Sequence, residues 1–195
     1  MKRLAITPGF WGAVGLLWLS GQEQRTLPLL AAVAAHEAGH LLALRALGAQ
    51  VLSLRLGFLD ARIETRVLSY RQELPAALAG PAASFFCGVI FSRHAPGFAA
   101  ISLLLGAFNL LPVWPLDGGR ALRAGLGLRL SPVRAERAAL AAGLLTCALG
   151  FGGALWFARA YGAGMMLVLV WCVIFVRLAR YGREEAIEGL HLRGR

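Results

Sequence analysis

The sequence is poor in acidic residues and cysteines, and it lacks long linkers and repeats. Its 195 residues include only ten Asp and Glu, against twenty Lys and Arg. The cysteines, Cys87, Cys147 and Cys172, are odd in number and lie in apolar segments without metal-ligand spacing. We therefore interpret these cysteines as small packing residues, and nothing in the sequence requires a disulfide. No long linker, low-complexity tract or internal repeat divides the chain, which predicts one domain over residues 1–195.

The chain is rich in apolar residues. They account for 58% of it, the mean hydropathy is +0.65, and they come in long blocks. This composition exceeds that of soluble domains and predicts an all-α membrane protein of about six transmembrane helices. No small-residue cleavage site follows Ser20, so the first block is interpreted as a span rather than a signal peptide. The expected spans are residues 4–20, 27–47, 74–91, 95–114, 138–158 and 163–178.

The net charge of +10 reflects topology rather than nucleic-acid binding. With six spans and both termini in the cytosol, every Lys and Arg except Arg25, Arg93 and Arg159 falls on the inner side. This distribution is the positive-inside bias of a multi-pass protein of the cell membrane. The expected partner surface is the lipid bilayer, with residues 179–195 as a short basic cytosolic tail and no nucleic acid bound.

Between the second and third expected helices, residues 52–58 and 63–67 alternate apolar and polar side chains around a short turn. This period of two predicts a small amphipathic β-hairpin at the inner membrane surface, the alternative being an ordinary interfacial loop. An open strand edge there must be covered by protein, water or a bound peptide. A stretch of small residues, 79–84, predicts close helix packing, either general or specifically against the second helix.

The second expected span contains the motif HEAGH at residues 36–40. Ionisable groups in hydrocarbon are costly and usually functional. On a helix His36 and His40 project from nearly one face, about 6 Å apart along the axis, so both can reach one metal ion. Glu37 is then placed as a general base. The pattern HExxH is typical of zinc hydrolases.

A catalytic zinc takes a third protein ligand, and Asp117 is the candidate. It stands between Pro112 and Pro115 on one side and a glycine pair on the other. The prolines would end the fourth helix, and the glycines permit unusual backbone angles that could aim the acid into the bundle. The alternative is an interfacial acid paired with Arg120. The rival third ligands are interpreted as solvated charges: Glu64, Glu73 and Glu136.

Together, HEAGH and the segment from Asn109 to Gly119 resemble the site-2 protease family of intramembrane zinc metalloproteases. Residues 6–11, the pair Gly80-Pro81 and the six-span plan are most similar to the branch of the stage IV sporulation protease, which processes a membrane-tethered pro-sigma factor. The resemblance implies Zn²⁺ as the cofactor and Glu37 as the catalytic base. It also implies that Asn109 lies near the scissile carbonyl and that the zinc ligands are His36, His40 and Asp117.

The function implied by this resemblance is regulated intramembrane proteolysis. A membrane-tethered protein, such as a pro-sigma factor or another transcription regulator, would be cut and released to the cytosol, with a membrane-protein regulator as a further partner. Members of the branch often carry a CBS domain, whereas here neither a CBS nor a PDZ domain is expected. Two alternatives are a catalytically silent scaffold of the same fold and a metal transporter, which would place ionisable pairs on several spans.

Overall fold

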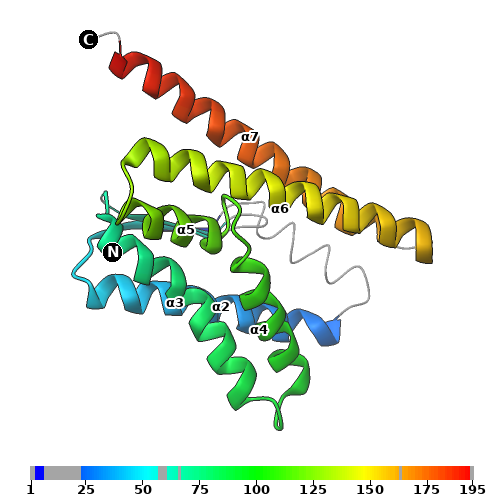
Figure 1. Cartoon of the computed structure of the whole chain (residues 1–195). Coiled ribbons are helices and arrows are strands. Elements are labelled where there is room, and N and C mark those ends of the chain that lie inside the picture. Colours follow the sequence, from blue (N-terminus) through cyan, green and yellow to red (C-terminus); the bar gives the residue numbers. More distant parts are fainter. Residues whose placement is uncertain (1–2, 7–22, 57–60, 66, 163, 194–195) are drawn as a thin grey trace. The chain divides into compact units, whose positions relative to one another are not determined.

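The computed structural model describes residues 3–6, 23–56, 61–65, 67–162 and 164–193. The chain forms two compact units, Met1–Asn109 and Leu110–Arg195. The first unit contains β1 (Arg3–Ile6), α2 (Glu23–Ala46), β2 (Val51–Leu56), β3 (Ala61–Thr65), α3 (Tyr70–Ile90) and α4 (Pro96–Asn109) (Figure 1). The second contains α5 (Asp117–Gly127), α6 (Pro132–Tyr161) and α7 (Met165–Arg193).

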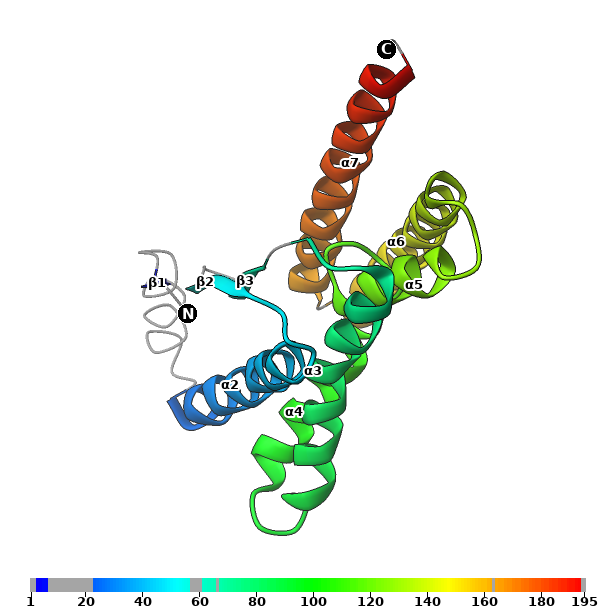
Figure 2. The ribbon, with the colours of Figure 1, turned by 90° about the vertical axis from the view of Figure 1, so that its left-hand side faces the viewer.

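Small residues allow the three helices of the first unit to approach closely. Helix α2 packs against α3 and α4, and α3 and α4 lie side by side (Figure 2). A Cβ added at Gly39 of α2 would lie 2.6 Å from the Ala79 carbonyl oxygen and 2.7 Å from the Ala83 Cβ. The small-residue stretch of α3 therefore packs on the helix that carries the HEAGH motif. Packing in membranes favours such contacts because apolar side chains gain little by leaving lipid.

Helix α2, which carries the HEAGH motif, ends in a defined turn. Gly48 adopts a left-handed conformation with φ of 67°. The Ala49 N–H donates to the Leu44 carbonyl at 2.9 Å, and the Gly48 N–H donates to the Arg45 carbonyl at 3.0 Å. These two bonds form the Schellman motif, in which glycine avoids the steric cost of the left-handed region.

The segment that follows α2 contributes two strands of a three-stranded sheet of order β1-β2-β3; β1 precedes α2. Strand β2 is central, parallel to β1 and antiparallel to β3, with Leu54 opposite both Leu4 and Ile63. The expected turn at residues 57–60 lies outside the described residues, and the hairpin's place at the membrane surface stays a prediction. Strand β3 ends at Thr65, so Val67, expected to extend the alternation, lies beyond the strand.

The second unit is held together by a small apolar core. Trp114 stacks on Tyr181 with ring centroids 4.4 Å apart. Around this pair, large side chains fill the space between α6, α7 and the segment before α5. The buried members are Val113, Cys147, Ile174 and Leu178, with Leu111, Leu116, Leu140, Val170 and Trp171 packed against them.

Four helical segments of the described chain have the length and apolar composition to cross a membrane: Thr26–Ala46, Tyr70–Ile90, Pro132–Tyr161 and Met165–Arg183. Helix α4 is apolar but has only 14 residues, about 21 Å, and it ends at Asn109 rather than continuing to residue 114 as expected. The first expected span begins within β1, and residues 7–20 lie outside the described part. The fold is mostly helical but not all-α, because it includes the sheet.

Candidate active site

Helix α2 directs both histidines of the motif into the interior of the first unit. Its buried positions Ala32, His36, His40 and Leu44 recur every four residues and so form one face. His36 is 4% exposed and His40 is 6% exposed. Two polar rings on the buried face of an apolar helix need polar partners, because an unpaired buried polar group is costly.

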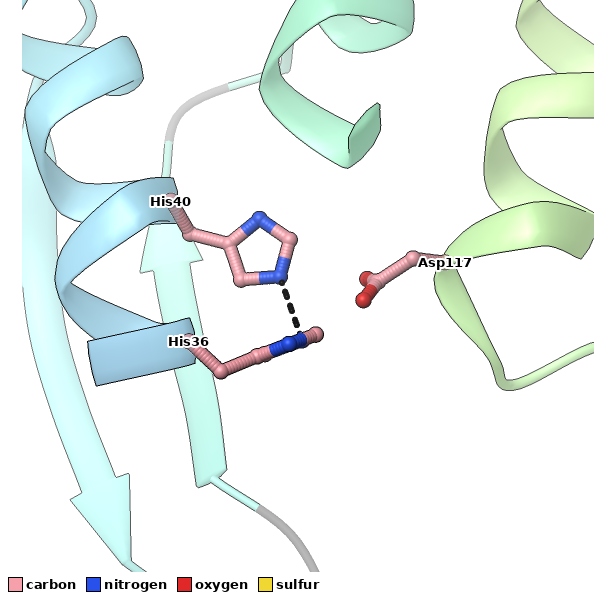
Figure 3. Close-up of side chains that lie close together, drawn as sticks. All are labelled: His36, His40 and Asp117. Atoms are coloured by element: carbon pink, nitrogen blue, oxygen red, sulfur yellow. Dashed lines mark hydrogen bonds between the residues drawn. The ribbon is translucent and has the colours of Figure 1, made fainter. Parts of the chain in front are cut away.

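Those partners come from α3. The His40 Nδ1–H donates to the carbonyl oxygen of Ala76 at 2.7 Å. His36 Nδ1 lies 2.8 Å from Ser84 Oγ. The two Nε2 atoms lie 3.2 Å apart, as the dashed line marks (Figure 3). Each ring is thus held at Nδ1 by α3, which turns both Nε2 atoms toward the same point.

Gly80 makes room for this arrangement. An added Cβ at Gly80 would collide with His40 Nε2 and would lie 2.7 Å from His36 Nε2, far closer than van der Waals contact. Gly80 lies on α3 midway between Ala76 and Ser84, at successive intervals of four residues. The α3 backbone therefore passes directly beside the two ring nitrogens, and only glycine fits there.

Asp117 is the first residue of α5 in the second unit and is 7% exposed. Its carboxylate benefits from the positive end of the helix dipole. The Arg120 Nη1 lies 3.5 Å from Asp117 Oδ1, so the ion pair expected as the alternative role is present. A carboxylate has two oxygens, and this pair engages one of them.

The glycine pair after Asp117 serves close packing. Both residues have helical, negative φ, because the positive-φ glycines of the described chain are Gly48, Gly162 and Gly164. The expectation of unusual backbone angles at Gly118 and Gly119 was wrong. An added Cβ at Gly118 would collide with the Leu110 carbonyl, and one at Gly119 would lie 2.5 Å from the Val113 carbonyl carbon. The pair lets the loop from Leu110 to Trp114 lie against the start of α5.

The two other predicted functional residues are partly exposed. Glu37 follows His36 on α2, beside the buried face. Asn109 is the last residue of α4, and its Nδ2–H donates to the Leu105 carbonyl at 3.0 Å. An amide nitrogen carries two hydrogens, so this bond engages one of the two donors.

Two of the rival ligands are not the solvated charges expected. Glu73, in the first turn of α3, is buried at 7% exposure. Glu136 is partly buried, with Oε2 3.8 Å from Arg123 Nη1 and with Oε1 enclosed and without a hydrogen-bond partner among the described residues. Both acids are thus enclosed despite their basic sequence neighbours. The side chain of Glu64 lies outside the described part.

Comparison with known proteins decides the family. Residues 93–150, which contain Asn109 and Asp117, match the model of peptidase family M50. Rip3 of Mycobacterium tuberculosis is 34% identical over 171 residues, covering 74% of this chain and 42% of Rip3. The chain belongs to peptidase family M50. The zinc metalloprotease MJ0392 of Methanocaldococcus jannaschii is 28% identical over 124 residues, covering 57% of the chain and 37% of that protein.

The fold of this M50 chain is also known from a solved structure. The site-2 protease from Methanocaldococcus jannaschii is similar with a TM-score of 0.63 and 21% identity, covering 91% of this chain and 89% of that one. The M50 chain spans about two fifths of the length of the curated relatives Rip3 and MJ0392.

Sequence reasoning missed the α3 contribution to this site. Ala76, Gly80 and Ser84 were covered only in part by the small-residue stretch 79–84. Their spacing of four residues places them on one helix face, opposite a histidine pair with the same spacing. That shared period was the available signal, but the direction in which α3 packs on α2 was needed to use it.

Proposed function

We propose that this M50 chain is an intramembrane zinc metalloprotease whose zinc ligands are His36, His40 and Asp117. The observation that carries the proposal is the buried pair of imidazoles with Nε2 atoms 3.2 Å apart. Two nitrogens directed at one point can bind one cation, and imidazole is the commonest metal ligand in proteins. Such a pair in an apolar helix has no evident packing role.

The donor set fits zinc. His40 donates its Nδ1–H to a carbonyl oxygen, which can only accept, so the neutral ring presents a lone pair at Nε2. All three proposed ligands are buried, and each offers one nitrogen or oxygen atom. Two imidazoles and one carboxylate form the donor set of catalytic zinc sites that keep a fourth position open. Metal ligands held by hydrogen bonds at their far nitrogen are typical of such sites.

The proposed chemistry is peptide hydrolysis with Glu37 as general base. Bound zinc would supply Lewis acidity, polarising a carbonyl and lowering the pKa of water toward about 7. Glu37 accepts the proton of the attacking water and later delivers it to the leaving amine. One Asn109 amide hydrogen bonds to the Leu105 carbonyl, and the other stabilises the developing oxyanion.

The proposed substrate is a membrane-tethered protein. Four helices of membrane-crossing length support this location, and a carbonyl inside a substrate helix must be released from its i to i−4 bond before it can be cut. An exposed sheet edge could hold the unwound segment as an added strand. The resemblance to the sporulation branch favours a pro-sigma factor or another tethered transcription regulator as the substrate, with a membrane protein as regulator.

The proposed direction of release is the cytosol. The basic residues support a topology with both termini inside. Arg45 lies five residues after His40, about 7.5 Å along α2, which supports a position of the histidine pair in the inner half of the membrane. Arg120, Arg123 and Arg129, which follow Asp117, are assigned to the same side.

The test is Glu37→Gln in the purified full chain, measured for zinc content and for cleavage of a membrane-tethered reporter. The amide keeps the size of the side chain but cannot take the proton. Cleavage should fall by about 10²- to 10⁴-fold while zinc content stays at the wild-type level. A variant that retains most of the wild-type cleavage rate would show that Glu37 is not the base.

A further inference from the structure

We infer that the Ser84 hydroxyl is a positioning group for His36 and adapts to either proton arrangement of that ring. The inference rests on the proposed function and concerns how the chain itself prepares the ligand pair. Ser84 is 0% exposed, and its Oγ lies 2.8 Å from His36 Nδ1. It belongs to α3, not to either of the motifs that carry the predicted ligands.

The two histidines are held by partners of different kinds. The Ala76 carbonyl accepts only, so His40 keeps its hydrogen on Nδ1. A hydroxyl can both donate and accept, so Ser84 imposes no single arrangement on His36. One ring is thus fixed in the form that presents a lone pair at Nε2, whereas the other can exchange between two forms.

This difference matters because of the contact between the rings. For the two Nε2 atoms to hydrogen-bond at 3.2 Å, one must carry a hydrogen, and His40 has its hydrogen on Nδ1. His36 then carries its hydrogen on Nε2, and its Nδ1 accepts from Ser84. When both Nε2 atoms face a cation, the His36 hydrogen must move to Nδ1 and donate to Ser84. Ser84 remains a partner throughout, and the buried ring is never left unpaired.

Gly80 restricts how the two histidine rings can be placed. An added Cβ there would meet both Nε2 atoms, so the backbone of α3 closes one side of the ring pair. His36 keeps its place through the bond at Nδ1, and rotation away from that bond would leave a buried nitrogen without its α3 partner.

The experiment compares Ser84→Ala with Ser102→Ala in the full chain. Ser102 is a matched control, because it is also 0% exposed, lies on α4 in the same unit, and its Oγ has no hydrogen-bond partner among the described residues. Zinc affinity is measured by competition with a chelator. The geometry at the metal is measured by the visible absorption spectrum of the Co²⁺-substituted protein.

Ser84→Ala should weaken zinc affinity by about 10- to 100-fold, as loss of a hydrogen-bonding partner of a ligand does elsewhere, and should change the Co²⁺ spectrum. Ser102→Ala should leave both unchanged. Wild-type affinity and spectrum in Ser84→Ala would overturn the inference but leave the proposed function standing, and so would equal losses in both variants. A wild-type chain that binds no zinc would overturn the proposed function itself.

Discussion

At the residue scale, Asp117 combines an observed ion pair with a proposed role as a metal ligand. Its ion pair with Arg120 was the alternative to metal binding, yet the two are compatible. Arg120 engages Oδ1, and the carboxylate has a second oxygen. An arginine paired with a carboxylate also fixes the orientation of that carboxylate before a metal binds.

Asp117→Asn is the residue-scale prediction for the third ligand. A neutral amide is a poorer zinc ligand than a carboxylate and loses the pairing with Arg120. We expect zinc affinity to fall by more than the roughly 10- to 100-fold assigned to loss of a ligand's partner, as measured by chelator competition. Glu73→Gln, which neutralises another buried acid, is the control. Zinc loss from Glu73→Gln but not from Asp117→Asn would identify Glu73, and not Asp117, as the third ligand.

Helix α3 is the element that holds the histidine pair in place. It supplies a carbonyl acceptor at Ala76, an open glycine surface at Gly80 and a hydroxyl at Ser84, three positions spaced four residues apart. The carbonyl lies opposite His40, the glycine opposite both Nε2 atoms and the hydroxyl opposite His36. The packing of α3 on α2 therefore determines where the nitrogens point.

Gly80→Ala tests this role of α3. The added methyl would occupy the space of the two Nε2 atoms, so we expect zinc content to fall severely. Gly97→Ala adds the same group where no atom lies within 4 Å and should keep the wild-type zinc content. The measurement is metal analysis of both purified variants. Full zinc occupancy in Gly80→Ala would mean that the ring pair does not sit against α3 as described.

The sheet carries the second element-scale prediction. Leu54 is paired on both sides, to Leu4 and to Ile63, so proline there removes a ladder bond from the central strand. If the sheet edge holds the substrate, Leu54→Pro should lower reporter cleavage while zinc content is retained. Val67→Pro is the control, because Val67 is fully exposed and follows the strand. Equal cleavage in the two variants would remove the sheet from substrate binding.

The elements differ in how far the sequence could predict them. The spacing of His36 and His40 predicted a shared face, and the 3.2 Å separation confirms it. The end of α4 at Asn109 and the enclosure of Glu73 could not be predicted, because both depend on which helices pack together. The sequence suggested conformational freedom as the role of the glycine pair after Asp117. Its actual role, the close approach of the preceding loop, is visible only in three dimensions.

At the scale of the whole molecule, the sequence supplies a predicted topology but not the packing of the helices. Charge bias depends on the composition of loops and needs no tertiary information. The sheet formed by β1, β2 and β3 brings together segments distant in the chain. Local patterns encode neither this pairing nor the division into two units. The orientation in the membrane therefore stays a prediction from charge.

Cysteine-accessibility labelling tests that orientation in a variant without the three native cysteines. Arg129→Cys and Arg93→Cys place probes at exposed positions in two different loops. The probe at position 129 should react only from the cytosolic side and the probe at position 93 only from outside. The reverse pattern would invert the topology and the direction of product release.

Identifying the peptide bond that is cut tests the central claim of intramembrane zinc proteolysis most directly. The full chain and a reporter with one transmembrane segment are reconstituted in lipid vesicles, and the released product is weighed by mass spectrometry with and without a chelator. The cut should fall inside the transmembrane segment, disappear with the chelator and return with added zinc. A cut in the water-exposed part of the reporter, or one that persists after zinc removal, would contradict the proposed function.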